Sequence, residues 1–307
     1  MKLSIVTTLY DSAPFIDKFY QRASQAAKQA TDQYELVMVD DGSPDESLQI
    51  AVALAKRDPH VRVVELSRNF GHHKALMAGL SYAQGELIFL IDVDLEEAPE
   101  LLKPFQDQLE KNDCDVVFGY QARRKGGLIE SSGGRIAWYL INKLYATKIP
   151  PNQSTVRLMR RDYVDALLLH RESNTVIGGL WVITGFRQIG VPIEKGHRAG
   201  ASYTLARRIV TLLNGITSFS TVPLILMVYM GMTVSFTSFL FGMFVVLQKL
   251  LYNSAVGWAS LIASIWFMGG IIVFCLGIIG IYISRIFVET KNRPYVIVRK
   301  VHQSEIR

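Results

Sequence analysis

One charged residue, Lys249, interrupts the chain between residues 209 and 284. The two uncharged stretches on either side, 209–248 and 250–284, are each longer than the roughly 20 apolar residues that cross a bilayer. A buried helical hairpin is the alternative interpretation, but soluble cores rarely hold uncharged runs of this length. We therefore predict two transmembrane helices, near residues 222–247 and 256–284.

The charges on either side of this pair predict its orientation. Lys249 is the one cation in the connection, whereas the flanks carry many: Arg207, Arg208, Arg285, Lys291, Arg293, Arg299 and Lys300. Positive residues stay on the cytoplasmic side, so we expect a multi-pass protein of the plasma (inner) membrane with both termini cytoplasmic. No signal peptide is evident in the opening KLSIVTTLY.

The net charge of +6 is concentrated near the apolar segments, which favours a lipid surface as partner and argues against nucleic acid. The basic, amphipathic sequence LARRIVTLL predicts an interfacial helix within residues 205–221. A basic cytoplasmic tail, 285–307, is expected to follow the membrane region, 222–284.

The first 204 residues alternate short apolar runs with helical patterns, which is typical of an α/β domain with a mostly parallel sheet. The runs predict strands at 3–9, 34–39, 61–66, 86–91 and 115–119. A first helix is expected over 14–30. The sequence Ser43-Pro44-Asp45-Glu46 resembles a capping box and predicts a second helix with Ser43 as its N-cap.

Charged residues follow several of these strands directly, namely Asp40, Asp41, Arg68, Asp92 and Asp94. Because ligands bind at the carboxyl ends of parallel strands, we expect these side chains to gather at one edge of the sheet.

The triplet Asp92-Val93-Asp94 is the strongest chemical signal in the chain. Two carboxylates one residue apart, after a buried strand, can share a hard divalent cation that also takes waters and phosphates. The alternative is a set of acids that favour a helix N-terminus near Pro99. The adjacent His72 and His73 are expected to diverge, which argues against a shared metal.

Other nucleotide-binding signatures are missing from the sequence. No G-x-G-x-x-G follows the first strand, and no G-x-x-x-x-G-K-[ST] occurs. The dinucleotide and P-loop interpretations are therefore weak.

Five segments together resemble the membrane-anchored family 2 glycosyltransferases, in particular the polyprenyl-phosphate glycosyltransferases related to dolichol-phosphate mannose synthase and the bactoprenol glucosyltransferases. They are SIVTTLYDS, VMVDDGS, LSRNFGHHKAL, AQGELIFLIDVDLEEAPELL and KIPPNQSTVRLMRR. The resemblance implies a Rossmann-like GT-A domain over residues 1–204, followed by interfacial and transmembrane helices.

The resemblance also implies a reaction. It is the inverting transfer of a sugar from a nucleotide-sugar, with UDP favoured, to a polyprenyl (undecaprenyl) phosphate at the cytoplasmic membrane face. The lipid-linked sugar would supply cell-surface glycan modification. A homo-oligomer is compatible with the family.

Site roles follow from the same resemblance, position by position. Asp92, Asp94 and Arg123 would be catalytic, and Asp94 with Glu96 would hold Mg²⁺ or Mn²⁺. The acceptor phosphate would meet Arg123, Arg124 and Arg157. The donor would be bound by Thr8, Tyr10, Asp11, Asp41, Ser43, Arg68, Asp92 and Arg198.

Three departures from the family pattern stand out. Asp11-Ser12 replaces an Asn-Glu pair, Thr155 replaces an Asp, and a lysine expected after Arg198 is missing. They leave open the identity of the donor and the role of position 155. The alternative function is a glycosyltransferase that acts on a hydroxyl of a glycolipid or glycan. A membrane adaptor with an inactive transferase domain is less consistent with the intact Asp92-Val93-Asp94.

Overall fold

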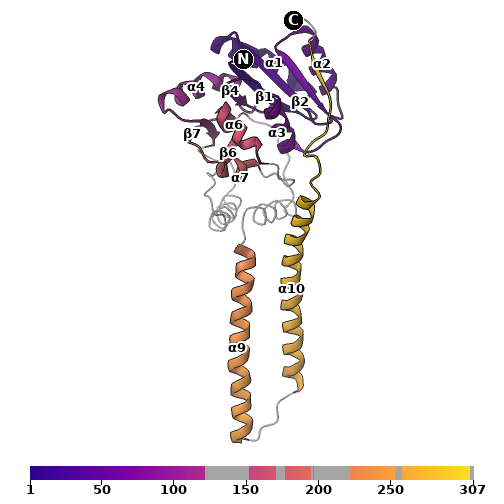
Figure 1. The fold of residues 1–307 in the computed structure, drawn as a ribbon, viewed down its shortest axis with the longest axis vertical. Coiled ribbons are helices and arrows are strands. Elements are labelled where there is room, and N and C mark those ends of the chain that lie inside the picture. The colour runs from indigo at the N-terminus through magenta and orange to yellow at the C-terminus, as the bar shows by residue number, and fades with distance from the viewer. Residues whose placement is uncertain (122–151, 171–176, 195, 197–221, 253–257, 305–307) are drawn as a thin grey trace. The chain divides into compact units, whose positions relative to one another are not determined.

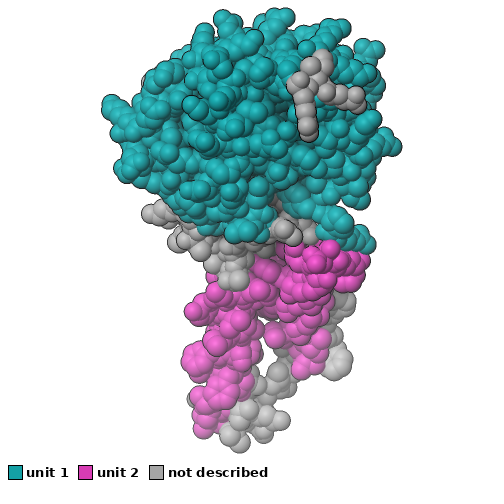
Figure 2. All heavy atoms as spheres, turned by 45° about the horizontal axis from the view of Figure 1, so that its top comes forward, with its two compact units in different colours: residues 1–142, 147–204, 293–307 teal, residues 143–146, 205–292 magenta. Residues whose placement is uncertain are grey.

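The computed structural model describes residues 1–121, 152–170, 177–194, 196, 222–252 and 258–304. The chain divides into two compact units (Figure 2). The first comprises residues 1–142, 147–204 and 293–307, and the second comprises residues 143–146 and 205–292.

The first unit is built around an eight-stranded sheet with the order β7-β5-β6-β4-β1-β2-β3-β8. Strands β1 to β4 are parallel, β6 runs antiparallel between β4 and β5, β7 is parallel to β5, and β8 is antiparallel to β3. The strands are β1 (Leu3–Leu9), β2 (Tyr34–Asp40), β3 (Val61–Leu66), β4 (Leu87–Leu90), β5 (Val116–Tyr120), β6 (Gln153–Arg160), β7 (Gln188–Pro192) and β8 (Val298–Gln303). The predicted α/β fold with a mostly parallel sheet is confirmed. Each of the first five strands begins and ends within one residue of its expected position.

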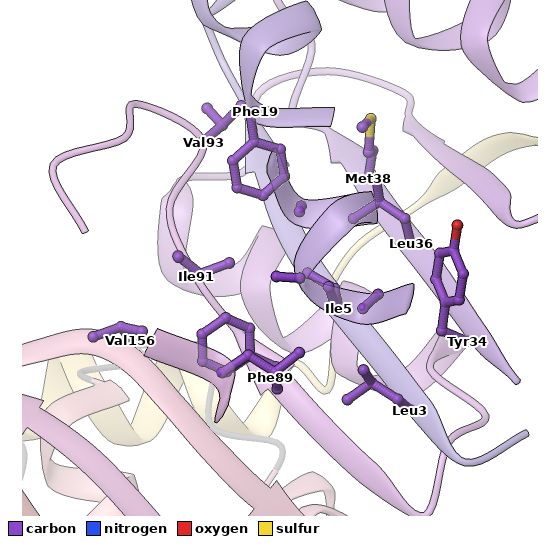
Figure 3. Close-up of a cluster of buried hydrophobic side chains, with 14 of the residues drawn as sticks. Leu3, Ile5, Phe19, Tyr34, Leu36, Met38, Phe89, Ile91, Val93 and Val156 are labelled. Atoms are coloured by element: carbon purple, nitrogen blue, oxygen red, sulfur yellow. The ribbon is translucent and has the colours of Figure 1, made fainter. Parts of the chain in front are cut away.

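Helices cover both faces of this sheet (Figure 1). They are α1 (Ala13–Ala30), α2 (Ser47–Arg57), α3 (His72–Tyr82), the 3-10 helix η1 (Pro99–Leu101), α4 (Leu102–Lys111), α6 (Arg161–Leu168) and α7 (Ile177–Ile183). Side chains from α1, α2 and α4 bury one continuous apolar core against the sheet, which includes Ile5, Phe19 and Phe89 (Figure 3).

Helix α3 packs on the opposite face, close to β1 and β2. A Cβ atom on Gly79 would lie 2.6 Å from Val6 and 2.9 Å from Val39, so only glycine permits this approach. The N-terminus of α3 is thereby held next to the ends of the two central strands.

The second helix does not begin as predicted. The N-cap of α2 is Glu46, with no side-chain cap hydrogen bond, so the capping box at Ser43 was wrong. Instead, the Asp45 carboxylate accepts hydrogen bonds from the backbone N–H groups of Ala13 (2.9 Å) and Ser47 (3.1 Å). Asp45 therefore joins the starts of α1 and α2, and residues 43–46 form a turn.

The C-terminal residues do not form only a basic tail. Residues 298–303 are the edge strand β8, in register with β3 from Arg62↔Gln303 to Leu66↔Val298. The sequence VRKVHQ has no apolar run, which is why strand patterning missed it. The first unit therefore contains both the beginning and the end of the chain.

The second unit contains two long apolar helices, α9 (Val222–Tyr252) and α10 (Trp258–Thr290). Within them, Leu224–Phe244 and Phe267–Thr290 are long and apolar enough to cross a membrane, and their side chains are not buried inside the protein. Two helices of this kind were predicted, and α10 extends beyond the expected residue 284. The interfacial helix expected over 205–221 lies outside the described residues.

Candidate functional site

The carboxyl ends of β1, β2 and β4 meet the N-terminus of α3 at one edge of the sheet. Thr8 lies near the end of β1, Asp41 follows β2, Asp92 and Asp94 follow β4, and His72 is the first residue of α3. This juxtaposition arises because three neighbouring parallel strands end on this side of the sheet, with Leu9 level with Asp40 and Leu90 level with Val6.

Asp41 is 2% exposed and fixes the loop before α3. Its Oδ1 accepts a hydrogen bond from the N–H of Phe70 (2.7 Å), and its Oδ2 accepts one from Gly71 (2.9 Å). Burial raises the pKa of Asp41, although these two N–H groups oppose the shift. The loop lies so close that a Cβ on Gly42, whose φ is +65°, would be 2.6 Å from the nitrogen of Asn69.

His72 connects the strand ends. Its Nδ1 lies 3.1 Å from Thr8 Oγ1, and its Nε2 lies 3.6 Å from Asp92 Oδ1. Removal from water lowers the pKa of His72, while the charges of Asp41 and Asp94 oppose that shift. The imidazole nevertheless keeps 47% of its surface accessible, so it can also meet a ligand at this edge.

The acid turn after β4, residues 92–97, is shaped by its own backbone. Leu95 has φ +61°, and Asp94 Oδ1 accepts a hydrogen bond from the N–H of Glu96 (3.1 Å). Glu97 is fully buried and accepts a hydrogen bond from Ser154 Oγ on β6. Asp92, Asp94 and Glu96 remain half-buried on the turn.

The acids of this region do not all serve to favour the N-terminus of the helix near Pro99. Glu100, in the first turn of η1, forms a bidentate pair with Arg22 of α1 (2.6 Å and 2.9 Å), and Glu97 is bound to Ser154. The carboxylates of Asp92 and Asp94 instead lie near His72, at the edge of the sheet.

The fit to a divalent cation rests on the chemistry of the acid turn. Half-buried carboxylate oxygens are the ligands that Mg²⁺ and Mn²⁺ prefer, and such ions usually retain positions for water and phosphate. No group of three His, Cys, Asp or Glu side chains gathers at metal-binding geometry in the part of the chain that the structure describes.

The remaining donor-side residues predicted from the resemblance lie around the same edge. Tyr10 is 53% exposed, Asp11 has φ +52°, and the N–H of Ser43 donates to Asp40 Oδ2 (3.4 Å).

Arg68 is exposed and its guanidinium stacks on the Phe70 ring, 4.1 Å from the centroid. Its Nη1 donates to the carbonyl of Asn69 (2.9 Å), so it lies on the loop rather than over the carboxylates.

Arg157 does not present itself to solvent as the predicted ligand of an acceptor phosphate. It is fully buried, and its guanidinium carbon lies 2.9 Å from the centroid of the Trp181 ring. Two bonds hold the group in place, from Nε to the Thr155 carbonyl and from Nη2 to the Ser154 carbonyl, both 3.2 Å. Burial lowers the pKa of Arg157 to about 9, so the side chain stays protonated at neutral pH. Its predicted role toward an acceptor phosphate stays a prediction.

Three predicted site residues, Arg123, Arg124 and Arg198, lie outside the described residues. Strand order predicted Asp41, Asp92 and Asp94 at one edge of the sheet, and the family resemblance added Thr8, but His72 was missed. The signal that could have found it is its position directly after Gly71, at the start of a helix that follows a strand end.

Comparison with known proteins agrees with this architecture. Residues 4–168 match the model of glycosyl transferase family 2. A Mycobacterium tuberculosis protein described among glycosyltransferases is 46% identical over 100% of this chain and 90% of its own length. The bactoprenol glucosyl transferase of Shigella phage SfII is 34% identical over 99% of each chain.

Among solved structures, mannosyl-3-phosphoglycerate synthase from Rubrobacter xylanophilus aligns with a TM-score of 0.49 at 16% identity, covering 71% of this chain and 73% of that one. Taken with the sheet, the acid turn and the full-length relatives, the family match shows that the chain belongs to glycosyl transferase family 2.

Proposed function

We propose that this protein transfers a sugar from a nucleotide-sugar, with UDP favoured, to a polyprenyl phosphate at the cytoplasmic face of the plasma membrane. One observation carries the proposal: a strand-end carboxylate site and two membrane-length helices occur in a single chain. Its full-length relatives include proteins named bactoprenol glucosyl transferase, which supports a polyprenyl acceptor.

On the donor side, Asp94 and Glu96 would hold Mg²⁺ or Mn²⁺. Such a cation would supply positive charge to neutralise the donor's diphosphate. Asp92, kept in place by His72, would meet the ribose and phosphates. Thr8, Tyr10, Asp11, Asp41, Ser43 and Arg68 would line the base and ribose, and Arg198 would lie over the diphosphate.

On the acceptor side, a phosphate oxygen of the lipid would attack the anomeric carbon from the face opposite the leaving diphosphate. The new bond inverts the anomeric configuration, and the nucleoside diphosphate leaves with the electron pair of the broken bond. A phosphate monoester has its second pKa near ~6, so it is already anionic at neutral pH and needs no general base. Arg123 and Arg124 would hold this phosphate.

Thr155 is compatible with such an acceptor. It occupies the position of the family's Asp, on β6 two residues before Arg157, and a threonine hydroxyl is not a general base at neutral pH. A hydroxyl acceptor would need a positioned carboxylate or histidine to remove its proton.

The cytoplasmic location rests on β8. Because β3 and β8 belong to one sheet, residues 61–66 and 298–303 must lie on the same side of any membrane. We infer that the chain crosses the bilayer an even number of times between them, which α9 and α10 satisfy. The excess of Lys and Arg outside the pair favours the cytoplasm for that side.

The purified protein should be given a panel of radiolabelled nucleotide-sugars with polyprenyl phosphate or with the matching free polyprenol. We expect label on the phosphate from one or a few donors, and none on the alcohol. Label on the free alcohol or on a sugar hydroxyl, with the phosphate unmodified, would contradict the proposal.

A further inference from the structure

The last residues of the first unit contact the loop that leads into the candidate site. We call residues 293–304 the C-terminal segment and residues 67–74 the donor loop. The N–H of Ser67 donates to the carbonyl of Ile297 (2.9 Å), and the Lys74 ammonium lies 5.5 Å from the centroid of the Tyr295 ring. The C-terminal segment therefore touches the donor loop at both of its ends.

The opposite side of the donor loop faces the site. Asp41 accepts hydrogen bonds from the N–H groups of Phe70 and Gly71, and His72 lies between Thr8 and Asp92. The same eight residues are thus held by strand-end side chains on one side and by the C-terminal segment on the other.

A cluster of charged side chains fixes the C-terminal segment to β3, just before the donor loop begins in the sequence. Glu65, the penultimate residue of β3, meets His302 (2.9 Å) and Arg299 (3.3 Å) of β8, and its side chain is 11% exposed. Lys300 is its register partner on the same strand and is exposed. Since Glu65 precedes Ser67 by two residues, this anchor sets where the donor loop begins.

We propose that Tyr295 is a positioning residue for donor binding: it holds Lys74, and through it the donor loop, in the conformation that keeps Phe70 and Gly71 bonded to Asp41 and presents His72 to the nucleotide-sugar. The inference rests on the proposed function and extends it to a segment far outside the family match, which ends at residue 168. It assigns no contact between Tyr295 and the donor or the acceptor.

The test is a double-mutant cycle on the full-length protein, with UDP as the binding probe in calorimetry and the donor KM as the kinetic readout. A partly exposed cation–π contact is worth enough to change affinity about two- to fivefold. Tyr295→Leu should weaken UDP binding and raise the donor KM by this factor, and leave kcat and the acceptor KM unchanged. Tyr295→Phe, which keeps the ring, and Lys300→Gln, on the exposed side of β8, should behave like the unmodified protein.

The second arm of the experiment tests whether Tyr295 acts through Lys74. In a Lys74→Met background, Tyr295→Leu should cause no further loss. A further loss of the same size in that background would show that Tyr295 acts independently of Lys74, and the proposal would be overturned.

A third readout does not depend on turnover. Backbone amides of Phe70 and Gly71 should exchange with solvent faster in Tyr295→Leu, with or without nucleotide, while amides of β1 stay protected. Unchanged exchange at these two amides would overturn the positioning role. Failure of the unmodified protein to bind any nucleotide of a UDP, GDP and dTDP panel would instead overturn the proposed function, and this inference with it.

Discussion

Among single residues, Asp94 is expected to have the largest effect on turnover. Asp94 is half-buried on the acid turn, directly after Val93. Asp94→Ala should lower kcat by factors of about 10² to 10³ or more, the usual cost of removing an electrostatic stabiliser of the leaving group. Activity assays of the purified variant, with its thermal stability as a folding check, measure this.

The matched control is Glu100→Gln, which alters a nearby carboxylate that pairs with Arg22 at the surface. It should retain near-normal activity, while EDTA should mimic Asp94→Ala in the unmodified protein. Full activity in EDTA would refute the metal assignment.

His72 is expected to affect donor binding more than acceptor binding, because it contacts Thr8 and Asp92. His72→Ala removes both contacts, and we expect the donor KM to rise about fivefold to twentyfold, as for the loss of one or two hydrogen bonds. His73→Ala, at the next position on α3, is the control and should leave the donor KM near normal. Equal losses at both positions would show that the effect comes from α3 as a whole.

Thr155→Ala should retain substantial activity, because a phosphate acceptor needs no base at this position. The measurement is kcat with polyprenyl phosphate. A loss comparable to that of Asp94→Ala would mean that the Thr155 hydroxyl takes part in the reaction.

At the scale of elements, β8 should be sensitive to acid. Burial alone would raise the pKa of Glu65, but the bonds from His302 and Arg299 outweigh it and hold the pKa below its usual value. Stability gained from such a depressed pKa is present above the unfolded pKa of about 4.3 and is lost as the pH falls through the lower folded value.

Thermal unfolding of the detergent-solubilised protein between about pH 3 and pH 6 should therefore show a fall in Tm at the acid end that Glu65→Gln reduces. Glu110→Gln, on the exposed end of α4, serves as the control and should keep the full fall. If both variants keep the full fall in Tm, the ion pairs of Glu65 with Arg299 and His302 contribute no pH dependence.

The first five strands were predictable because each is a local apolar run that is buried in the sheet. The strand β8 was not, because VRKVHQ contains no apolar run and its partner β3 lies far away in the sequence. The start of α2 was misplaced for a related reason: Asp45 bonds to Ala13 as well as to Ser47, and a tertiary contact outweighed the local capping pattern.

The candidate site was likewise predictable only where local sequence pattern determines the position of a residue. Asp92 and Asp94 follow a strand directly, so their place at the sheet edge follows from the order of elements alone. The role of His72 depends on the close packing of α3 at Gly79, and the burial of Arg157 depends on Trp181, which comes from a separate helix. Contacts of this kind leave no local pattern in the sequence.

For the whole molecule, the shared sheet makes membrane topology testable. Reporter fusions at residues 1 and 307 should both report the cytoplasm, and one inserted at residue 255, between α9 and α10, should report the opposite side. Reports from opposite sides for the two ends would contradict the pairing of β3 with β8 in one sheet.

The pairing of β3 with β8 also has a consequence for biosynthesis. Glu65 and His302 are 237 residues apart, and both apolar helices are translated between them. The ribosome therefore releases β8 only after α9 and α10 have been made. Until then, β3 has no strand partner on the side that β8 will occupy. A nascent chain would therefore complete this sheet, and the contacts between the C-terminal segment and the donor loop, only after both apolar helices have been synthesised.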